Sequence, residues 1–129
     1  MDLLKGEHCL LRRESFGGTL FSVKRGKRIY VNHDEYLAMK LSSHITKALA
    51  DELGEAIMPV IITGPKYLPN DNFSAPDTVF LEVTRACNLH CVHCFNASGK
   101  QLPKQLSYIQ FESVIEDIVS SGVQEIRFT

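Results

Sequence analysis

Residues 79–94 have the sequence VFLEVTRACNLHCVHC, and this stretch decides both the fold and the chemistry that the sequence predicts. Its first five residues are apolar except for Glu82, which is the pattern of a parallel strand buried on both faces. Three cysteines then follow on a short stretch, at Cys87, Cys91 and Cys94. The sequence therefore predicts a buried strand that leads directly into a cysteine loop.

Three thiolates on one loop can meet at a single soft-metal centre, because thiolates select iron–sulfur clusters, zinc or Cu(I) over hard cations. The C-x3-C-x2-C spacing does not by itself choose among these metals. A zinc site would take His90 or His93 as a fourth ligand and close the coordination shell. An iron–sulfur cluster with three cysteine ligands would leave one iron open, and an open iron can bind a small chelating molecule.

The composition places the chain among soluble globular proteins. It has 129 residues, 44% of them apolar and 22% charged, with a formal net charge of -1, so one ordinary domain or two small ones are expected. No apolar run approaches the roughly 20 residues of a membrane-spanning helix, and the N-terminus lacks the pattern of a signal peptide. We therefore predict a cytoplasmic location, where thiols stay reduced and clustered cysteines are metal ligands more often than disulfides.

The residues after the cysteine loop predict one helix and one further strand. Ser107 and Gln110 form a capping-box pattern, and an apolar stripe with helical spacing then runs to Gly122. Residues 123–129 resume strand character. The order strand, loop, helix, strand over residues 78–129 favours an α/β fold with a right-handed βαβ unit.

The strand and the segment TRACNLHCVHC resemble the cluster loop of the radical S-adenosylmethionine (radical SAM) superfamily, whose motif is C-x3-C-x-Φ-C. The resemblance covers residues 78–129. It implies that Cys87, Cys91 and Cys94 hold a 4Fe-4S cluster and that S-adenosylmethionine chelates the fourth iron. His93 falls on the Φ position, which implies a contact with the adenine of this cofactor. The implied activity is reductive cleavage of S-adenosylmethionine to a 5'-deoxyadenosyl radical, with electrons from a reductant such as ferredoxin or flavodoxin.

The resemblance also implies the first part of a partial (β/α)6 barrel, with the cysteine loop at the carboxyl end of its first strand. In the family the second strand runs into a Gly-Gly-Glu-Pro segment that binds the amino group of S-adenosylmethionine. The sequence ends at Thr129, where that segment should begin. We therefore expect a truncated piece of a longer enzyme, inactive on its own.

The N-terminal part predicts a second, smaller unit. Residues Cys9–Glu14, 19–25 and 28–31 have strand character, and Asn32 with Glu35 forms a helix cap. A second helix is predicted from a cap at Ser43 or His44 to Gly54, with Ile45, Ala48, Leu49 and Leu53 on one face. Cys9 lies in a strand pattern and is predicted to be a core thiol. The proline-rich residues 64–77 predict a linker, which gives domains at 1–63 and 78–129.

Residues 1–63 resemble the winged-helix-like RiPP recognition element found in front of many radical SAM peptide maturases. The resemblance implies that a precursor's leader peptide adds as a strand beside the third strand, near Arg28, Ile29, Tyr30 and Val31. The basic residues Lys24, Arg25, Lys27 and Arg28 would suit an acidic leader, and a solvated hairpin tip remains the alternative. The family's third helix is not expected here, because residues 55–63 contain Pro59 and β-branched residues.

The competing hypothesis is an iron–sulfur or zinc-containing winged-helix regulator that binds DNA. Such a protein needs a recognition helix rich in Arg, Lys, Asn or Gln. The second predicted helix offers only Lys47 and carries Asp51 and Glu52. The sequence therefore favours the enzyme over the regulator, and nucleic acid is not an expected partner.

Overall fold

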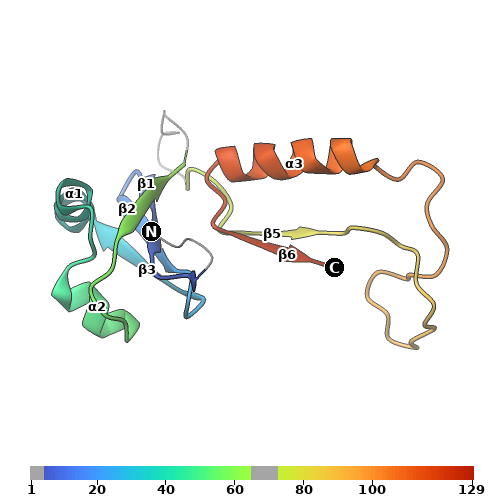
Figure 1. The fold of residues 1–129 in the computed structure, drawn as a ribbon, viewed down its shortest axis with the longest axis horizontal. Helices are drawn as coiled ribbons and strands as arrows, with labels where there is room; N and C mark the ends of the chain where they lie inside the picture. The colour runs from blue at the N-terminus through green and yellow to red at the C-terminus, as the bar shows by residue number, and fades with distance from the viewer. Residues whose placement is uncertain (1–4, 65–72) are drawn as a thin grey trace.

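The computed structural model of the chain describes residues 5–64 and 73–129 (Figure 1). The middle of the predicted linker, residues 65–72, lies outside the described residues. The chain is a mixed α/β protein, as expected. In order, the elements are β1 (Cys9–Glu14), β2 (Gly17–Ser22), β3 (Lys27–Asn32), α1 (His33–Ser42), α2 (Lys47–Leu53), β4 (Val60–Thr63), β5 (Thr78–Leu81), α3 (Tyr108–Ser120) and β6 (Glu125–Phe128).

The N-terminal strands form one sheet in the order β3-β2-β1-β4. β1, β2 and β3 pair antiparallel, as the alternating sequence predicts. The predicted bounds 19–25 and 28–31 were wrong, because the strands pair from Gly17↔Asn32 to Ser22↔Lys27. The turn between them is closed where the Gly26 N–H donates to the Ser22 carbonyl at 2.8 Å.

Residues 60–63 form an edge strand that the sequence did not predict as a strand. β4 runs parallel to β1, from Cys9↔Val60 to Arg12↔Thr63. Pro59 prevents a continuing helix here, and the β-branched residues that follow fit a pleated strand. The absence of a helix at 55–63 agrees with the expectation.

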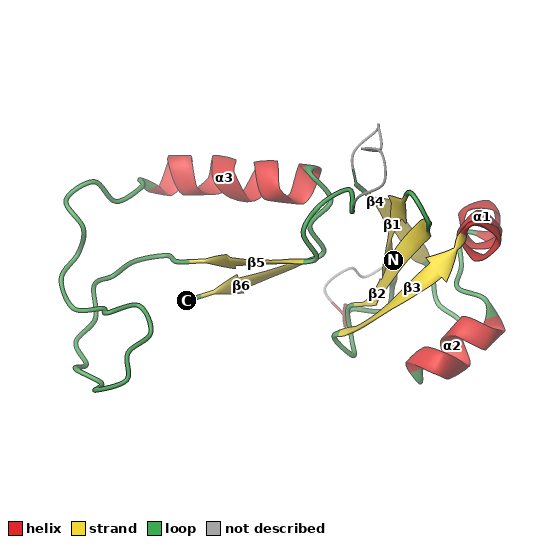
Figure 2. Cartoon of the chain, turned by 180° about the vertical axis from the view of Figure 1, so that it is seen from behind, coloured by secondary structure: helices red, strands yellow, loops and turns green. Residues whose placement is uncertain are grey.

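Two short helices cover one face of this sheet (Figure 2). α1 begins at the predicted capping box, in which the Asn32 side chain accepts from the Glu35 N–H and the Glu35 side chain accepts from the Asn32 N–H. The predicted cap of α2 was wrong: Ser43 ends α1 in the left-handed region, and Thr46 caps α2. α2 ends at Gly54 as predicted. The core between helices and sheet is built from Cys9, Leu11, Leu20, Val31, Tyr36, Met39, Ile45, Leu49, Ala50, Leu53 and Met58.

The C-terminal half is a strand, loop, helix and strand, in the predicted order. The expectation of a strand buried on both faces was wrong: β5 is only half-buried and Phe80 is 66% exposed, because β6 is the only described strand that pairs with it. β5 and β6 pair in parallel, from Thr78↔Glu125 to Leu81↔Phe128. α3 begins at the predicted capping box of Ser107 and Gln110. Its stripe of Phe111, Val114, Ile115 and Ile118 is half-buried, with the Phe111 and Phe128 ring centroids 6.5 Å apart. Within residues 5–64 and 73–129, no helix has the length and apolar character needed to cross a membrane.

The second face of the N-terminal sheet packs against the start of β5 and the turn between α3 and β6. Arg12 and Glu14 project from this face, and both side chains are completely buried. The Arg12 guanidinium donates to the Glu14 carboxylate at 2.5 Å, to the Asp77 carboxylate at 2.6 Å and to the carbonyls of Pro76 and Gly122 at 3.0 and 3.1 Å. A buried polar junction therefore joins the two halves of the chain.

Candidate metal centre

The cysteine loop lies at the far end of the β5–β6 pair from the N-terminal sheet (Figure 1). It leaves the carboxyl end of β5, and the carboxyl end of the parallel strand β6 is beside it. The carboxyl ends of parallel strands are where open α/β sheets and barrels place their ligands. An apolar hollow of about 340 Å³ lies at this end, lined by Phe80, Phe95 and Thr129.

Hydrogen bonds hold the base of the loop. The Gln105 side chain donates to the Val83 carbonyl at 3.2 Å and accepts from the Thr84 hydroxyl at 3.0 Å. Across the loop, the Cys87 N–H donates to the Gly99 carbonyl at 3.1 Å, and the Gly99 N–H donates to the Arg85 carbonyl at 2.7 Å. The backbone on both sides of the three cysteines is thus tied down.

The three thiols are free and accessible. Cys87 and Cys91 are exposed and Cys94 is half-buried. Backbone N–H groups point at two of the sulfurs: Leu89 donates to the Cys87 Sγ at 3.5 Å and Ser98 to the Cys94 Sγ at 3.3 Å. The bonds from the backbone and side chain of Ser98 lower the pKa of the Cys94 thiol, which favours the thiolate that binds metals.

Three free cysteine thiols are a suitable donor set for a soft metal or an iron–sulfur cluster, although the structure does not bring the three sulfurs together at one point. Among the described residues, no three His, Cys, Asp or Glu side chains are close enough together to hold a metal ion. The fit therefore rests on three free thiols of one loop and on the N–H groups directed at the sulfurs of Cys87 and Cys94. Such N–H···S bonds are among the interactions that tune cysteine-ligated iron.

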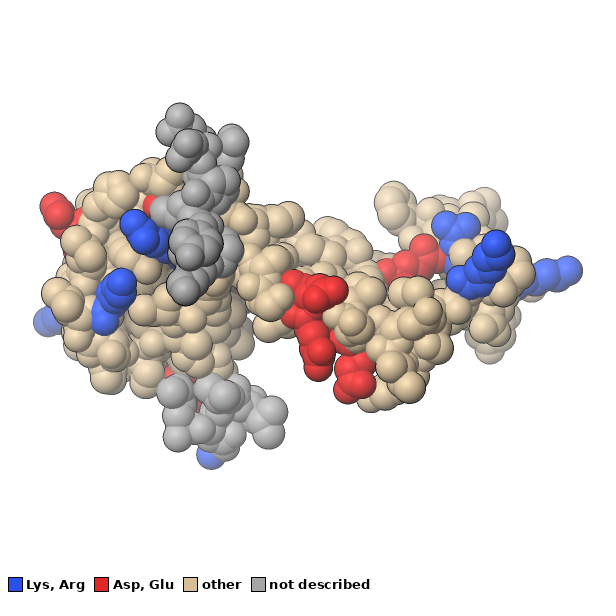
Figure 3. All heavy atoms as spheres, turned by 90° about the horizontal axis from the view of Figure 1, so that it is seen from above, with Lys and Arg blue, Asp and Glu red and all other residues tan. Residues whose placement is uncertain are grey.

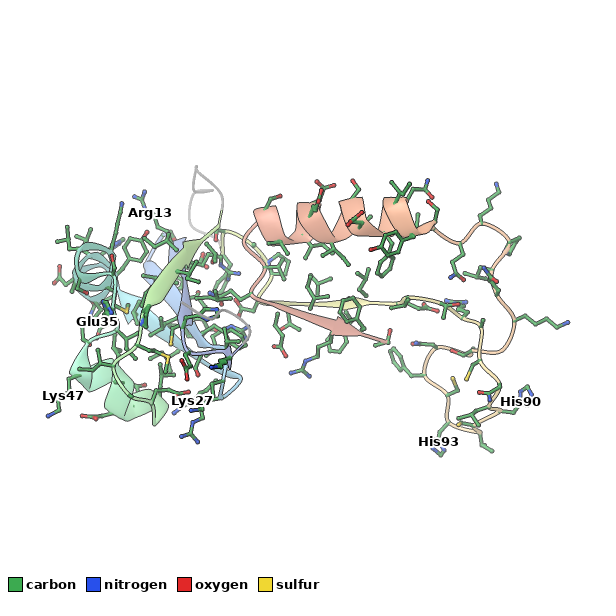
Figure 4. The ribbon with its side chains drawn as sticks, in the orientation of Figure 1. Arg13, Lys27, Glu35, Lys47, His90 and His93 are labelled. Carbon is green, nitrogen blue, oxygen red and sulfur yellow. The ribbon has the colours of Figure 1, made fainter. Side chains whose placement is uncertain are left out.

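The two histidines of the loop lie away from the strands. His90 and His93 are both exposed, and Figure 4 places them at the outer end of the loop. The zinc alternative requires one of them to approach the cysteines, and the adenine contact implied for His93 requires it to face the cofactor. Both assignments remain predictions.

Cys9 belongs to a different environment, as predicted. It is fully buried in the core of the N-terminal sheet. Burial raises the pKa of its thiol to about 11, and the negative charge of Glu55 adds to the increase. A neutral thiol with this pKa is a packing residue, so Cys9 provides a natural control for the loop cysteines.

The predicted docking strand β3 forms one edge of the N-terminal sheet, and no described strand pairs with its outer side. Its side chains divide between two faces. Ile29 and Val31 belong to the core side, whereas Tyr30 donates to the Asp77 carboxylate at 3.3 Å and Arg28 donates to the Asp77 carbonyl at 3.2 Å.

The basic residues near the turn differ in burial: Lys24, Arg25 and Lys27 are exposed, as in a solvated hairpin tip, whereas Arg28 is half-buried. Arg28 is buried apart from 18% of its side chain and also donates to Gln124 at 3.3 Å. The Lys27 ammonium donates to the Glu52 carbonyl at 2.6 Å, and Arg25 donates to the Gly54 carbonyl at 2.9 Å. The tip alternative was therefore wrong for Arg28, since the second half of the chain covers it.

Sequence reasoning missed the junction residues Arg12, Asp77 and Gln124. Gln124 donates to the carbonyls of Leu10 and Thr19 at 3.3 and 3.0 Å, and the Glu14 carboxylate accepts from the Ser74 N–H at 2.7 Å. Alternation along β1 predicts a polar face, and polar faces of antiparallel sheets commonly face water. The sequence carries no signal that another segment covers this face.

The fold and the site define an α/β protein with a three-cysteine loop at the carboxyl end of a parallel strand. Relatives of the chain include a maturation protein, a maturase and a cyclase. The chain is 32% identical over 96 residues to the sporulation killing factor maturation protein SkfB of Bacillus subtilis (strain 168), covering 74% of this chain and 22% of that protein. No protein-family model matches the chain.

Two further relatives share shorter regions. The mycofactocin maturase MftC of Mycolicibacterium smegmatis is 46% identical over 44 residues, which is 34% of this chain and 11% of the maturase. A GTP 3',8-cyclase of Chlorobaculum tepidum is 36% identical over 53 residues, which is 41% of this chain and 16% of the cyclase. The chain thus spans less than a quarter of the length of the curated relatives that it matches.

Proposed function

We propose that this chain carries the cluster loop of a radical SAM enzyme that modifies a peptide. The observation that carries the proposal is the C-x3-C-x2-C loop at the carboxyl end of the parallel strand β5. The names of two relatives, a maturation protein and a maturase, support it. The cyclase among the relatives favours an enzyme over a regulator.

In this proposal Cys87, Cys91 and Cys94 are the ligands of a 4Fe-4S cluster, and His93 lies beside the adenine of S-adenosylmethionine. The cluster and S-adenosylmethionine together would supply a 5'-deoxyadenosyl radical. The loop's own residues hold the thiolates: the N–H groups of Leu89 and Ser98 stabilise the charge on sulfur, and Gln105 fixes the base of the loop. The hollow lined by Phe80, Phe95 and Thr129 offers an apolar surface at the same end.

Anaerobic reconstitution with iron and sulfide tests this assignment. The reduced chain should give the electron paramagnetic resonance (EPR) signal of a 4Fe-4S cluster, and the signal should shift when S-adenosylmethionine is added, because the fourth iron has no protein ligand. Cys91→Ser should lose most of the cluster. Cys9→Ser should retain the cluster and its shift, because Cys9 is buried in the N-terminal core.

A different metal would give a different pattern. Stoichiometric zinc, with no cluster after reconstitution, would reject the radical assignment in favour of a structural site. A cluster whose signal ignores S-adenosylmethionine would reject the open iron. Equal loss of cluster in Cys9→Ser and Cys91→Ser would show that the variants act through folding.

The finer architecture belongs to the same proposal. Residues 1–63 form a winged-helix-like domain, 64–77 a linker and 78–129 the start of a partial (β/α)6 barrel. A precursor peptide adds as an extra strand to the outer edge of β3, near Arg28, Ile29, Tyr30 and Val31. The unpaired outer edge of β3 supports this, since an exposed strand edge offers a row of backbone donors and acceptors.

Hydrogen exchange tests the docking edge. Peptides selected from a random library on the full chain should slow amide exchange in Lys27–Asn32, because strand addition pairs the outer amides of β3. The opposite edge strand, Val60–Thr63, is the internal control and should not change. Protection of β4 alone, or of the helices alone, would contradict docking at β3.

A further inference from the structure

Three aromatic residues form an exposed cluster on the N-terminal sheet. Phe16 lies in the turn between β1 and β2, Tyr30 lies on the edge strand β3, and Phe73 precedes β5. Their ring centroids are 5.6 to 5.9 Å apart, and two of the three pairs meet edge to face. The three residues are nevertheless 39 to 59% exposed. Grouped aromatic side chains on a surface mark interaction sites, because they offer a large apolar area for a partner to bury.

The position of Tyr30 places this aromatic cluster beside the unpaired edge of β3. Ile29 and Val31 pack towards the core, so Tyr30 between them lies on the opposite face, where its hydroxyl donates to the Asp77 carboxylate at 3.3 Å. Residues directly opposite each other on neighbouring strands share a face, with Cβ atoms about 4.5 to 5.5 Å apart. A strand added to β3 would therefore bring the residue opposite Tyr30 onto the aromatic cluster.

The charged groups beside the cluster already have partners. The Asp77 carboxylate accepts from Arg12 at 2.6 Å, and its second oxygen lies 3.7 Å from the Arg28 guanidinium. Arg28 is also 4.0 Å from the Glu125 carboxylate. Exposed charges gather elsewhere: in Figure 3 acidic side chains lie over the middle of the molecule, where α3 is, and basic ones lie at the end with the cysteine loop. The surroundings of the cluster therefore favour an uncharged ligand.

A hollow beside the rings provides room for a bulky side chain. It has a volume of about 540 Å³ and is lined by residues 73–77, so Phe73 belongs to both the hollow and the cluster. A side chain that enters from the edge of β3 would meet Tyr30 first and the ring of Phe73 next. Aromatic rings prefer the edge-to-face contacts that the three residues already make with one another.

We propose that Phe16, Tyr30 and Phe73 select the peptide that pairs with β3 by binding one aromatic side chain of that peptide. The inference deepens the proposed function, because it rests on strand addition at β3 and names the residue class that this edge accepts. The selected residue is the one opposite Tyr30. Its two neighbours in the peptide point to the other face of the sheet, so the rings do not contact them.

A cationic side chain is the main alternative occupant, since Lys and Arg also bind to aromatic faces. The carboxylate that borders the hollow is Asp77, and it already faces the guanidiniums of Arg12 and Arg28. A third cation would be repelled by both of them. An uncharged ring meets no such repulsion and buries the exposed aromatic surface.

Parallel selections from a random peptide library test the inference. Peptides recovered on the full wild-type chain should share one Phe, Tyr or Trp, and peptides recovered on Phe73→Ala should lose this shared residue. Phe73 lies outside both sheets and is 52% exposed, so the variant should fold. The matched control is Leu41→Ala, which removes an apolar side chain that is 85% exposed on α1 and should recover the same aromatic peptides as the wild type.

One recovered peptide, with its shared residue set to Trp, then serves as the probe. The chain contains no Trp, so the emission reports on the peptide alone. Replacing this Trp with Ala, or Phe73 with Ala, should each raise the Kd about tenfold or more. The two changes together should raise the Kd by less than the product of their separate effects, because both remove the same contact. Phe16→Leu, which removes a second ring, should also raise the Kd.

The outcomes separate this inference from the proposed function. Peptides that slow exchange in Lys27–Asn32 but share no aromatic residue, or bind Phe73→Ala as tightly as the wild type, would retain the docking edge and reject the aromatic site. A shared acidic or basic residue would assign selection to charge and reject it too. A library without binders, or binders that leave β3 unprotected, would reject both the docking edge and the inference. The EPR experiment on the cysteine loop is independent of all these results.

Discussion

Replacing Arg12 with methionine should lower the free energy of unfolding by about 3 to 5 kcal/mol, the usual cost of removing one partner from a buried ion pair. Methionine fills much of the volume but carries no charge. It would leave the fully buried Glu14 carboxylate without its cation and the carbonyls of Pro76 and Gly122 without this donor. Urea unfolding followed by circular dichroism measures the loss.

The neighbouring residue provides the control. Arg13 is exposed on the same strand (Figure 4), so Arg13→Met should change stability by no more than about 0.5 kcal/mol. The double variant Arg12→Met/Glu14→Gln should cost less than the sum of its single changes, because the amide carries no unpaired charge. A loss below about 1 kcal/mol for Arg12→Met would contradict a structural role for the buried pair.

Gly122→Ala should destabilise the chain by about 3 kcal/mol or more, because it combines backbone strain with a steric clash. Gly122 has φ +96, where side chains are strained, and an added Cβ would lie 2.4 Å from the Cα of Gly64. The contacted atoms of Gly64 belong to the backbone, so they cannot move aside as a flexible side chain would. Thermal unfolding compared with the wild type gives the effect.

Gly54 separates the two causes. It has φ +72 but nothing within 4 Å of an added Cβ, so Gly54→Ala should cost about 1 to 2 kcal/mol through strain alone. The excess for Gly122→Ala then measures the contact with Gly64. Equal losses at the two glycines would mean that the two halves of the chain do not approach as closely as the structure shows.

Loss of the junction should also affect how β3, the proposed docking strand, is held. Arg28 and Tyr30 of β3 contact Asp77, which immediately precedes β5, and β5 leads to the cysteine loop. Asp77 accepts from Arg12 as well as from Arg28 and Tyr30. The buried junction therefore both stabilises the fold and fixes the proposed peptide edge relative to the proposed metal centre.

The parts of the fold that the sequence predicted are those encoded over a few neighbouring residues. The capping boxes at Asn32 and Ser107 and the ends of α2 and α3 near Gly54 and Gly122 depend on residues three or four positions apart. The cysteine spacing likewise predicts soft-metal chemistry, because the chemistry depends on which ligands one short loop can supply. Strand bounds and the cap of α2 were less well predicted, since several nearby residues could serve.

The sequence by itself determined the α/β class, the capping boxes of α1 and α3 and the strand that leads into the cysteine loop. Only the tertiary structure decided that the polar face of the N-terminal sheet is buried and that Arg12 bonds to Asp77 and Gly122, which lie 65 and 110 residues away. Local patterns cannot specify such pairs, because burial of a charge depends on which distant segment covers it. The buried guanidinium is stable there because each segment that excludes water from it also supplies an oxygen to accept its hydrogen bonds.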